Sequence, residues 1–183
     1  FDETEARPIA MSLHGQVQLE RCGLDPAYVP LAVDTKVFKP TPITTIDGRP
    51  VTARELFGLP TTAFVVGVVA MNKGNVFDRK GFSEAFYGFG AFLHNHPNAI
   101  LFLHTDKSGA EGVTLQALAR DAGIPDEAIV WSDQYAYTIG FSAEMMAAAY
   151  TAMDVLLAPS HGEGFCVPLI EAQACGTPVI ASD

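Results

Sequence analysis

The stretch AFVVGVVA at residues 63–70 is a continuous apolar run that is rich in valine. A strand that helices cover on both faces shows such a run, whereas a half-exposed strand alternates apolar and polar residues. The run therefore predicts a strand in the interior of a sheet. Four more short apolar runs follow, and each predicts a further strand: residues 98–105, 128–132, 154–160 and 177–182.

Segments with helical periodicity separate these strands. Residues 81–97 place six apolar side chains on one helical stripe: Phe82, Ala85, Phe86, Phe89, Phe92 and Leu93. Further helices are predicted at residues 113–123, after the capping residue Ser142, and at residues 168–176. Strict alternation of strand and helix predicts an α/β fold, a Rossmann-like parallel sheet flanked by helices. The chain ends directly after its fifth predicted strand, so we expect a domain that is truncated at its C-terminus.

The first sixty residues have a different character. Residues 1–40 contain one segment with helical character, and we interpret them as the remnant of a preceding domain and its linker. Residues 41–60 are rich in proline and threonine, and we interpret them as an interdomain linker with a short helix at residues 53–57. Residues 61–183 then form the domain that contains the predicted sheet.

Composition excludes several classes of protein. The net charge is −10 and the 11 Lys and Arg residues are scattered, which argues against a surface for nucleic acid or anionic membranes. Cys22, Cys166 and Cys175 form no C-x-x-C pair, so neither a disulfide framework nor a zinc site is expected. The N-terminus lacks the features of a signal peptide, and no apolar run approaches the roughly 20 residues that span a bilayer. We expect a cytoplasmic protein without a transmembrane segment.

The loop that follows the fourth predicted strand carries the strongest chemical signal. Pro168 suits the first turn of a helix, because proline has no N–H to leave unbonded there. The four preceding amides should then lie near the helix start without intrahelical partners; they belong to Gly164, Phe165, Cys166 and Val167. Helix starts with such free amides bind phosphate. Glu163 and Glu171 are suited to accept hydrogen bonds from sugar hydroxyls, worth on the order of 1.5–3 kcal/mol each. A structural role for Glu171, as a complement to the helix dipole, is the alternative.

The loop at residues 71–80 is the densest positive stretch of an acidic chain. Lys73, Arg79 and Lys80 follow the first predicted strand, where an ammonium can reach a phosphate at the sheet edge. The alternative is that these are solvated surface charges. The loop is not a Walker A motif, and no G-x-G-x-x-G follows a strand, which disfavours a dinucleotide site.

The stretch HGEGFCVPLIEAQACGTPVIASD (161–183) closely resembles the E-x7-E signature of retaining GT-B glycosyltransferases, the glycosyl transferases group 1. The segments RKGF and VPLAVDTKVFKP also match the usual text and order of this family. The resemblance implies that the chain is the C-terminal, donor-binding half of a two-domain enzyme. Residues 1–40 would then belong to an N-terminal acceptor domain that is otherwise missing.

The resemblance also implies roles for individual residues. Glu163 would face the donor sugar and Glu171 the ribose, the amides of residues 164–167 would meet the sugar or the diphosphate, and Lys80 would bind phosphate. The loop at residues 131–135 would border the nucleobase, through Trp131, Ser132 and Asp133. The chain departs from the family at two places. Where an arginine is usual after the first strand it has Met71 and Asn72, so that Asn72, Lys73 or Arg79 would have to substitute, and Cys166 replaces a glycine.

The implied function is transfer of a hexosyl group from a UDP-, GDP- or ADP-sugar with retention at the anomeric carbon. Glu163 and Lys80 would be catalytic, and neither a metal ion nor a cofactor is expected. The chain alone should transfer little or nothing, and peripheral membrane association of a larger enzyme stays open. Two alternatives also stay open: a relative such as an epimerase or a phosphorylase, and an inert nucleotide-sugar-binding module.

Overall fold

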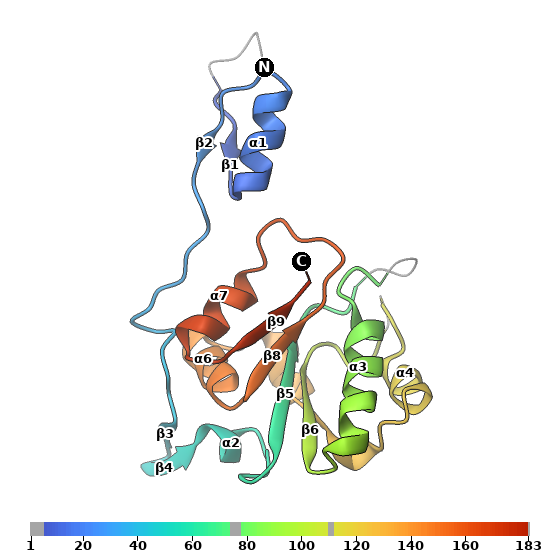
Figure 1. Ribbon diagram of the computed structural model, residues 1–183. Helices are drawn as coiled ribbons and strands as arrows, with labels where there is room; N and C mark the ends of the chain where they lie inside the picture. The colour runs from blue at the N-terminus through green and yellow to red at the C-terminus, as the bar shows by residue number, and fades with distance from the viewer. Residues whose placement is uncertain (1–5, 74–77, 110–111, 183) are drawn as a thin grey trace.

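The computed structural model describes residues 6–73, 78–109 and 112–182 (Figure 1). Five parallel strands form the central sheet in the order β7-β6-β5-β8-β9. Their bounds are β5 (Phe64–Val69), β6 (Ala99–His104), β7 (Ile129–Trp131), β8 (Val155–Ala158) and β9 (Val179–Ala181). All five strands predicted from the sequence are therefore present, each within the predicted range. The α/β fold with a Rossmann-like parallel sheet is confirmed.

Helices cover both faces of this sheet, as Figure 1 shows. On one face lie α3 (Phe82–Asn95) and α4 (Leu115–Asp121), and on the other α2 (Ala53–Leu56), α6 (Ala143–Thr151) and α7 (Val167–Ala174). A short helix α5 (Gln134–Ile139) and a 3₁₀ turn, η1 (Asp126–Ala128), complete the helical elements of this domain. The two faces produce two separate apolar clusters, one on each side of the sheet.

The predicted apolar stripe of α3 faces the sheet. Phe82, Ala85, Phe86 and Phe89 are at most 2% exposed, and Phe92 and Leu93 pack at the edge of the same cluster. Each buried phenylalanine contributes about 1.5–3 kcal/mol through apolar burial. This packing fixes α3 against the sheet.

A charged network anchors α2 at the opposite end of the strands. The guanidinium of Arg54 forms an ion pair with Asp154 at 2.7 Å, and the same carboxylate accepts the N–H of Val65 at 2.7 Å. Three other donors of Arg54 bond to the backbone carbonyls of Thr61, Ala63 and Ala152. Because Val65 is the second residue of β5 and Asp154 directly precedes β8, this network holds the end of the sheet at which its strands begin, the amino edge.

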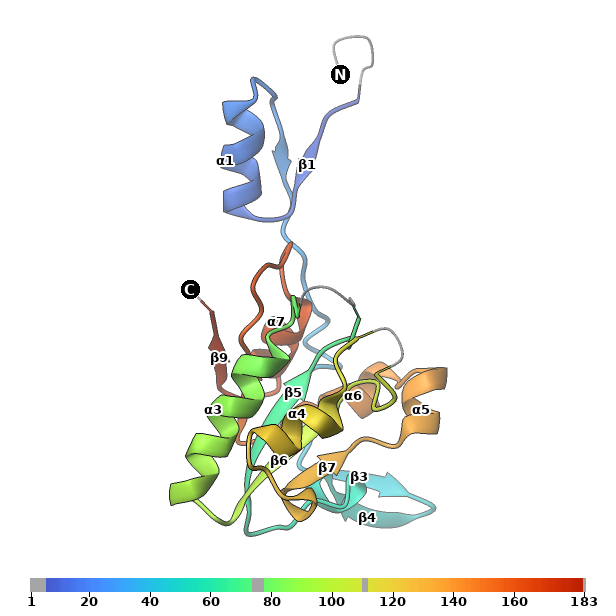
Figure 2. The ribbon, with the colours of Figure 1, turned by 90° about the vertical axis from the view of Figure 1, so that its right-hand side faces the viewer.

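Two smaller units precede the domain. β1 (Ile9–Ala10), α1 (Leu13–Arg21) and β2 (Ala27–Tyr28) form a unit that stands beyond the carboxyl ends of the sheet strands in both views (Figures 1 and 2). β3 (Ile43–Ile46) and β4 (Arg49–Thr52) form an antiparallel hairpin that the sequence did not predict, whereas the short helix predicted at residues 53–57 is present as α2. Its turn, Asp47-Gly48, has φ of 49° and 77°, the positive values that a tight hairpin turn requires.

The strand order places two loops side by side. β5 pairs with β6 on one side and with β8 on the other, so the order reverses between β5 and β8. In open parallel sheets, ligands bind outside the carboxyl ends of the strands at such a reversal. The two loops that leave this point are residues 70–81 and 159–166, which contain the charged residues singled out from the sequence.

Candidate active site

The loop after β5 ends in a tight turn that presents two cations. Asp78 accepts hydrogen bonds from the N–H groups of Phe82 (3.0 Å) and Ser83 (2.7 Å), and so caps the start of α3 with its carboxylate. The N–H of Gly81 closes the turn onto the carbonyl of Asp78 at 3.1 Å. Arg79 and Lys80 are the two residues inside this turn, and it holds their backbone firmly.

Gly81 brings this turn against the loop after β8. Its φ is +68°, and a Cβ at this position would lie 2.1 Å from the carbonyl oxygen of Pro159. A side chain is therefore excluded twice, by the backbone conformation and by the neighbouring loop. The N–H of His161 also donates to the carbonyl of Arg79 at 2.9 Å. Backbone contacts alone therefore hold the two loops together.

The side chains of Arg79, Lys80 and Glu163 meet where the loops join. Nζ of Lys80 lies 2.5 Å from Oε1 of Glu163, and Nη1 of Arg79 lies 3.2 Å from Oε2. Arg79 also donates to the carbonyl of Gly162 at 2.8 Å. Lys80 and Glu163 are mostly covered, with side chains 17% and 22% exposed, whereas Arg79 is 50% exposed. Two of the cations proposed from the sequence therefore share one carboxylate at the reversal of the sheet.

The pKa of Glu163 reflects this arrangement. Burial acts to raise it, but hydrogen bonds from Lys80 and Ser160, the charge of Lys80 and a hydrogen bond from Arg79 together outweigh burial. The pKa therefore lies below the usual value for glutamate, and Glu163 is an anion near neutral pH. The carboxylate of Glu163 can accept hydrogen bonds from ligand hydroxyls, while Lys80 and Arg79 can donate hydrogen bonds to a ligand phosphate.

The start of α7 lies in the same loop and is built differently from the start of α3. Cys166 is its N-cap and adopts the left-handed conformation, with φ 67° and ψ 67°, and no side chain caps the first turn. A non-glycine residue there costs on the order of 1–3 kcal/mol. In α3, Asp78 accepts hydrogen bonds from two amides of the first turn. The corresponding amides at the start of α7 have no side-chain acceptor, and they point to the space beyond the helix.

Glu171 lies within α7, and its carboxylate is bonded to the core. Oε2 accepts a hydrogen bond from the hydroxyl of Tyr150 on α6 at 2.6 Å. Burial raises the pKa of Tyr150 and Glu171 adds to this effect, so the phenol remains a donor. Glu163 and Glu171 thus have different partners, cations for the first and a neutral hydroxyl for the second.

Asn72, which the sequence offered as a substitute donor, is occupied elsewhere. Its side chain is buried (3% exposed), and both ends of its amide bond to the backbone of Val113 at 2.8 Å. Asn72 therefore ties the loop after β5 to the loop after β6. Lys73 is exposed, and its N–H donates to the carbonyl of Met71 at 3.0 Å.

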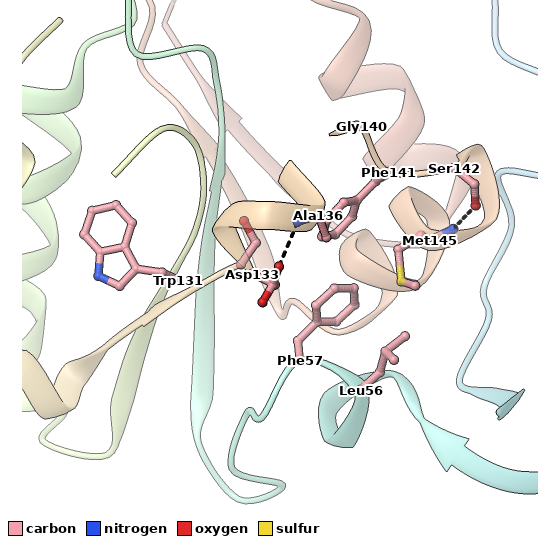
Figure 3. Close-up of a pocket in the computed structure, with 10 residues that line it drawn as sticks. Leu56, Phe57, Trp131, Asp133, Ala136, Gly140, Phe141, Ser142 and Met145 are labelled. Atoms are coloured by element: carbon pink, nitrogen blue, oxygen red, sulfur yellow. Dashed lines mark hydrogen bonds between the residues drawn. The ribbon is translucent and has the colours of Figure 1, made fainter. Parts of the chain in front are cut away.

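A pocket of about 530 Å³ adjoins the loop after β7 (Figure 3). Its wall includes all three residues singled out there from the sequence: Trp131, Ser132 and Asp133. Asp133 is the N-cap of α5 and accepts the N–H of Ala136 at 2.7 Å. The rings of Phe57 and Phe141 form the apolar part, nearly parallel with centroids 6.1 Å apart. The indole of Trp131 points away from these rings in Figure 3, and Nζ of Lys107 lies 5.3 Å from its centroid.

Sequence reasoning missed α5 and the polar groups beneath it. Gln134 joins two loops, because its amide accepts the N–H of Lys107 (2.8 Å) and donates to the carbonyls of Ser132 (2.9 Å) and Thr105 (3.3 Å). The signal for α5 was present in Asp133 as an N-cap residue and Gly140 as a stop.

Three buried polar atoms at the carboxyl ends of β6 and β7 have no hydrogen-bond partner among the described residues: Nδ1 of His104, Oγ1 of Thr105 and Oγ of Ser132. Burial lowers the pKa of His104 to about 4, so its imidazole is neutral at pH 7. Native structures leave few such groups unpaired, and a ligand or solvent is a usual partner at a functional site.

Across residues 6–73, 78–109 and 112–182, no group of three or more His, Cys, Asp or Glu side chains could hold a metal ion. Within the same residues, no helix is both long enough and apolar enough to cross a membrane.

The chain is similar in sequence to known proteins over the residues described above. The family model for glycosyl transferases group 1 matches residues 99–183, which include both glutamates and the loop after β7. Residues 99–183 belong to the glycosyl transferases group 1. A curated relative, the D-inositol 3-phosphate glycosyltransferase of Mycolicibacterium smegmatis, is 32% identical over 98% of this chain and 36% of its own length. The chain spans about a third of the length of the curated relatives it matches.

Solved structures show that this group 1 domain has the fold of the C-terminal half of GT-B enzymes. The C-terminal domain of a group 1 glycosyl transferase from Francisella tularensis superposes with a TM-score of 0.56 at 23% identity, over 82% of this chain and 70% of that one. Sucrose-phosphate synthase from Thermosynechococcus elongatus gives a TM-score of 0.70 at 25% identity, over 94% and 39% of the two chains. An Anabaena protein solved with UDP and glucose gives 0.66 at 18% identity, over 98% and 45%.

Proposed function

We propose that this chain is the donor-binding part of a retaining glycosyltransferase that moves a hexosyl group from a nucleotide sugar to an acceptor. Residues 61–183 would bind the donor, residues 41–60 would link the domains, and residues 1–40 would belong to the acceptor side. The observation that carries the proposal is the junction of Arg79 and Lys80 with Glu163 at the reversal of the sheet. It combines groups for phosphate and for sugar hydroxyls at one point.

The donor's diphosphate would bind between the turn after β5 and the start of α7. Lys80 and Arg79 supply two positive charges, and the amides of residues 164–167 add the positive end of the α7 dipole. Arg79 takes the part of the arginine that the family usually has earlier in this loop, because the turn capped by Asp78 brings it to the same carboxylate as Lys80. Asn72 has no part in this site, since Val113 occupies its amide.

The two glutamates would bind different hydroxyl groups. Glu163, at the junction with the cations, would hold hydroxyls of the transferred sugar. Glu171, eight positions later on α7, would accept hydrogen bonds from the ribose. Each charge-assisted bond contributes about 1.5–3 kcal/mol. The different partners of the two side chains support this division of roles.

The nucleobase would lie against the loop after β7, at the pocket beneath α5. Ser132 provides a buried hydroxyl without a partner among the described residues. Backbone groups of residues 131–135 would supply further hydrogen bonds to the base. UDP is the first nucleotide to test, because the Anabaena structure with a similar fold holds UDP and glucose.

Transfer needs stabilisation of a departing diphosphate and of positive charge that develops on the sugar ring. Lys80, Arg79 and the α7 amides would stabilise the leaving group as fixed electrostatic groups, which act without reorganisation at the moment of reaction. Glu163 would orient the sugar so that the new bond forms on the face from which the diphosphate departs. The acceptor would bind to the part of the longer relatives that this chain does not span.

Titration of the chain with UDP, GDP and ADP, followed by the backbone amide resonances, tests the proposal. One nucleotide should shift the amides of Gly164 and Lys80 together, with saturation. In a protein that joins this chain to an acceptor domain, proton NMR should then show a product with the donor's anomeric configuration. No shift with any of the three nucleotides would contradict the proposal, and nucleotide binding with an inverted or epimerised product would replace the transferase assignment.

A further inference from the structure

Tyr150 is completely buried (0% exposed), although it carries a polar hydroxyl. Burying an unbonded hydroxyl is costly, so its single side-chain partner is informative. That partner is Oε2 of Glu171, at 2.6 Å, a short distance typical of a hydrogen bond to a charged acceptor. The core of the domain therefore reaches the carboxylate of Glu171 through one hydroxyl group.

The position of this hydroxyl is fixed by its surroundings. The backbone carbonyl of Tyr150 accepts a buried hydrogen bond from Oγ1 of Thr177, at 2.7 Å, at the turn that leads into β9. The ring of Phe38 packs against the Tyr150 ring at a tilt, with centroids 6.4 Å apart. α6, α7 and the start of β9 thus converge on this side chain, which leaves the ring no room to follow a moving carboxylate.

We propose that Tyr150 is a positioning residue for ribose recognition: its hydroxyl holds Glu171 in the orientation that receives the ribose diol. This inference rests on the proposed role of Glu171. A carboxylate offers about four acceptor positions on two oxygens, and Tyr150 occupies one on Oε2. Among the described residues, no hydrogen-bond donor occupies Oε1 or the second acceptor position on Oε2, so both can receive the ribose diol. A glutamate without this restraint must lose its rotamer freedom when the ligand binds.

The test compares UDP, its 2′,3′-dideoxy analogue and inorganic pyrophosphate as ligands, with dissociation constants measured by calorimetry. Tyr150→Phe removes the hydroxyl and keeps the ring, and should weaken UDP binding about 3- to 10-fold. Binding of dideoxy-UDP and of pyrophosphate should stay unchanged, because neither has a ribose diol to present. Glu171→Gln should reduce UDP affinity at least as much, and the double variant should bind UDP no more weakly than Glu171→Gln alone.

Thr177→Val is the matched control, since it removes a buried hydrogen bond to the same tyrosine but leaves the hydroxyl in place. It should lower the melting temperature. The ratio of the dissociation constants for UDP and dideoxy-UDP should stay the same as in the protein without substitutions. This ratio does not depend on the fraction of folded protein, so a destabilised Tyr150→Phe variant still gives an answer. Incorporation of 4-aminophenylalanine at position 150, which restores a donor, should restore the ratio.

The outcomes separate the two claims. If Glu171→Gln changes the UDP to dideoxy-UDP ratio and Tyr150→Phe does not, the positioning role is overturned and the ribose assignment stands. If Glu171→Gln leaves the ratio unchanged, or UDP, GDP and ADP all fail to bind the unchanged protein, the proposed function fails and this inference fails with it. Equal weakening of all three ligands by Tyr150→Phe would also overturn the positioning role, because it would reveal a general structural effect.

Discussion

The two edges of the central sheet hold similar charges in opposite ways. At the amino edge, Arg54 pairs with Asp154, and its other donors bond to three backbone carbonyls. At the carboxyl edge, Lys80 pairs with Glu163, and among the described residues this carboxylate is its sole bonded partner. Arg54 thus uses four of its five guanidinium donors within the protein, whereas Lys80 leaves two of the three donors of its ammonium for a ligand.

The same contrast applies to uncharged groups. The buried side-chain atoms without partners, within the part of the chain that the structure describes, belong to His104, Thr105 and Ser132. These residues lie at the carboxyl ends of β6 and β7, where the strands of the sheet finish, which is the carboxyl edge. The amino edge serves folding, and the carboxyl edge carries unsatisfied groups that reduce stability and suit a ligand. Stability and nucleotide binding should therefore respond to different substitutions.

The largest loss of stability is expected at the amino edge. Arg54→Met leaves the carboxylate of Asp154 without its cation and several carbonyls without a donor. Because both side chains are partly exposed, at 21% and 34%, we expect a loss of about 3 kcal/mol in the free energy of unfolding, the lower end for such pairs. Urea denaturation measures it, with the exposed Arg49→Met as the control. The affinity of the folded protein for UDP should not change, and a loss of affinity would break the comparison.

His104 should make stability depend on pH. Its pKa is about 4 in the folded protein and near 6.5 in the unfolded chain, so the unfolded state binds a proton first as pH falls. Stability is therefore lost between pH 6.5 and pH 4, by about 2–3 kcal/mol. His104→Phe should flatten the profile of unfolding free energy over this window, whereas His14→Gln, at an exposed position, should leave it as it is. An unchanged profile in His104→Phe would show that the imidazole gains a partner in solution.

Gly81 tests the close approach of the two loops. Gly81→Ala and Gly123→Ala both place a side chain at nearly the same positive φ, +68° and +69°, but a Cβ on Gly123 meets nothing within 4 Å. Gly123→Ala should cost about 1 kcal/mol, and Gly81→Ala about 1 kcal/mol more, because its Cβ meets the backbone at Pro159. Gly81→Ala should also weaken UDP binding. Equal melting temperatures for the two variants would show that the loops are not in contact.

The smallest effect is expected at Cys166. Cys166 has a left-handed backbone conformation, which glycine adopts without strain. Cys166→Gly should therefore raise the free energy of unfolding by about 1 kcal/mol, measured by urea denaturation. Cys175→Ala provides the contrast, since Cys175 is buried at 3% exposure and its loss should destabilise the protein. A destabilised Cys166→Gly variant would mean that the thiol makes a contact that outweighs the strain.

The sequence predicted the strands and most of the helices because the signals are local. Continuous valine runs and the phenylalanine stripe of α3 indicate burial without knowledge of the fold. The hairpin β3–β4 was missed although Asp47-Gly48 is a strong turn signal, because the surrounding proline and threonine suggested a linker. Helix α5 has no buried residue, so no apolar stripe reveals it.

The site required information that local patterns do not contain. The motif around Glu163 and Glu171 indicated the chemistry, but the contact between Gly81 and Pro159 depends on β5 and β8 being neighbours. Strand order arises from the packing of the whole domain, and sequence distance gives no measure of it. For the same reason the sequence indicates only that Tyr150 lies in the helix that follows Ser142, and its hydrogen bond to Glu171 depends on the packing of α6 against α7.

The most direct test of the contrast between the edges is calorimetric titration of UDP into the unchanged chain, Lys80→Gln and Arg54→Met, each with its melting temperature. Lys80→Gln removes one charged contact to the phosphate of UDP. Its affinity for UDP should fall at least 10-fold, with little change in melting temperature. Arg54→Met should show the reverse, a lower melting temperature with unchanged affinity. UDP affinity in Lys80→Gln equal to that of the unchanged protein would contradict the assignment of the carboxyl edge as the nucleotide site.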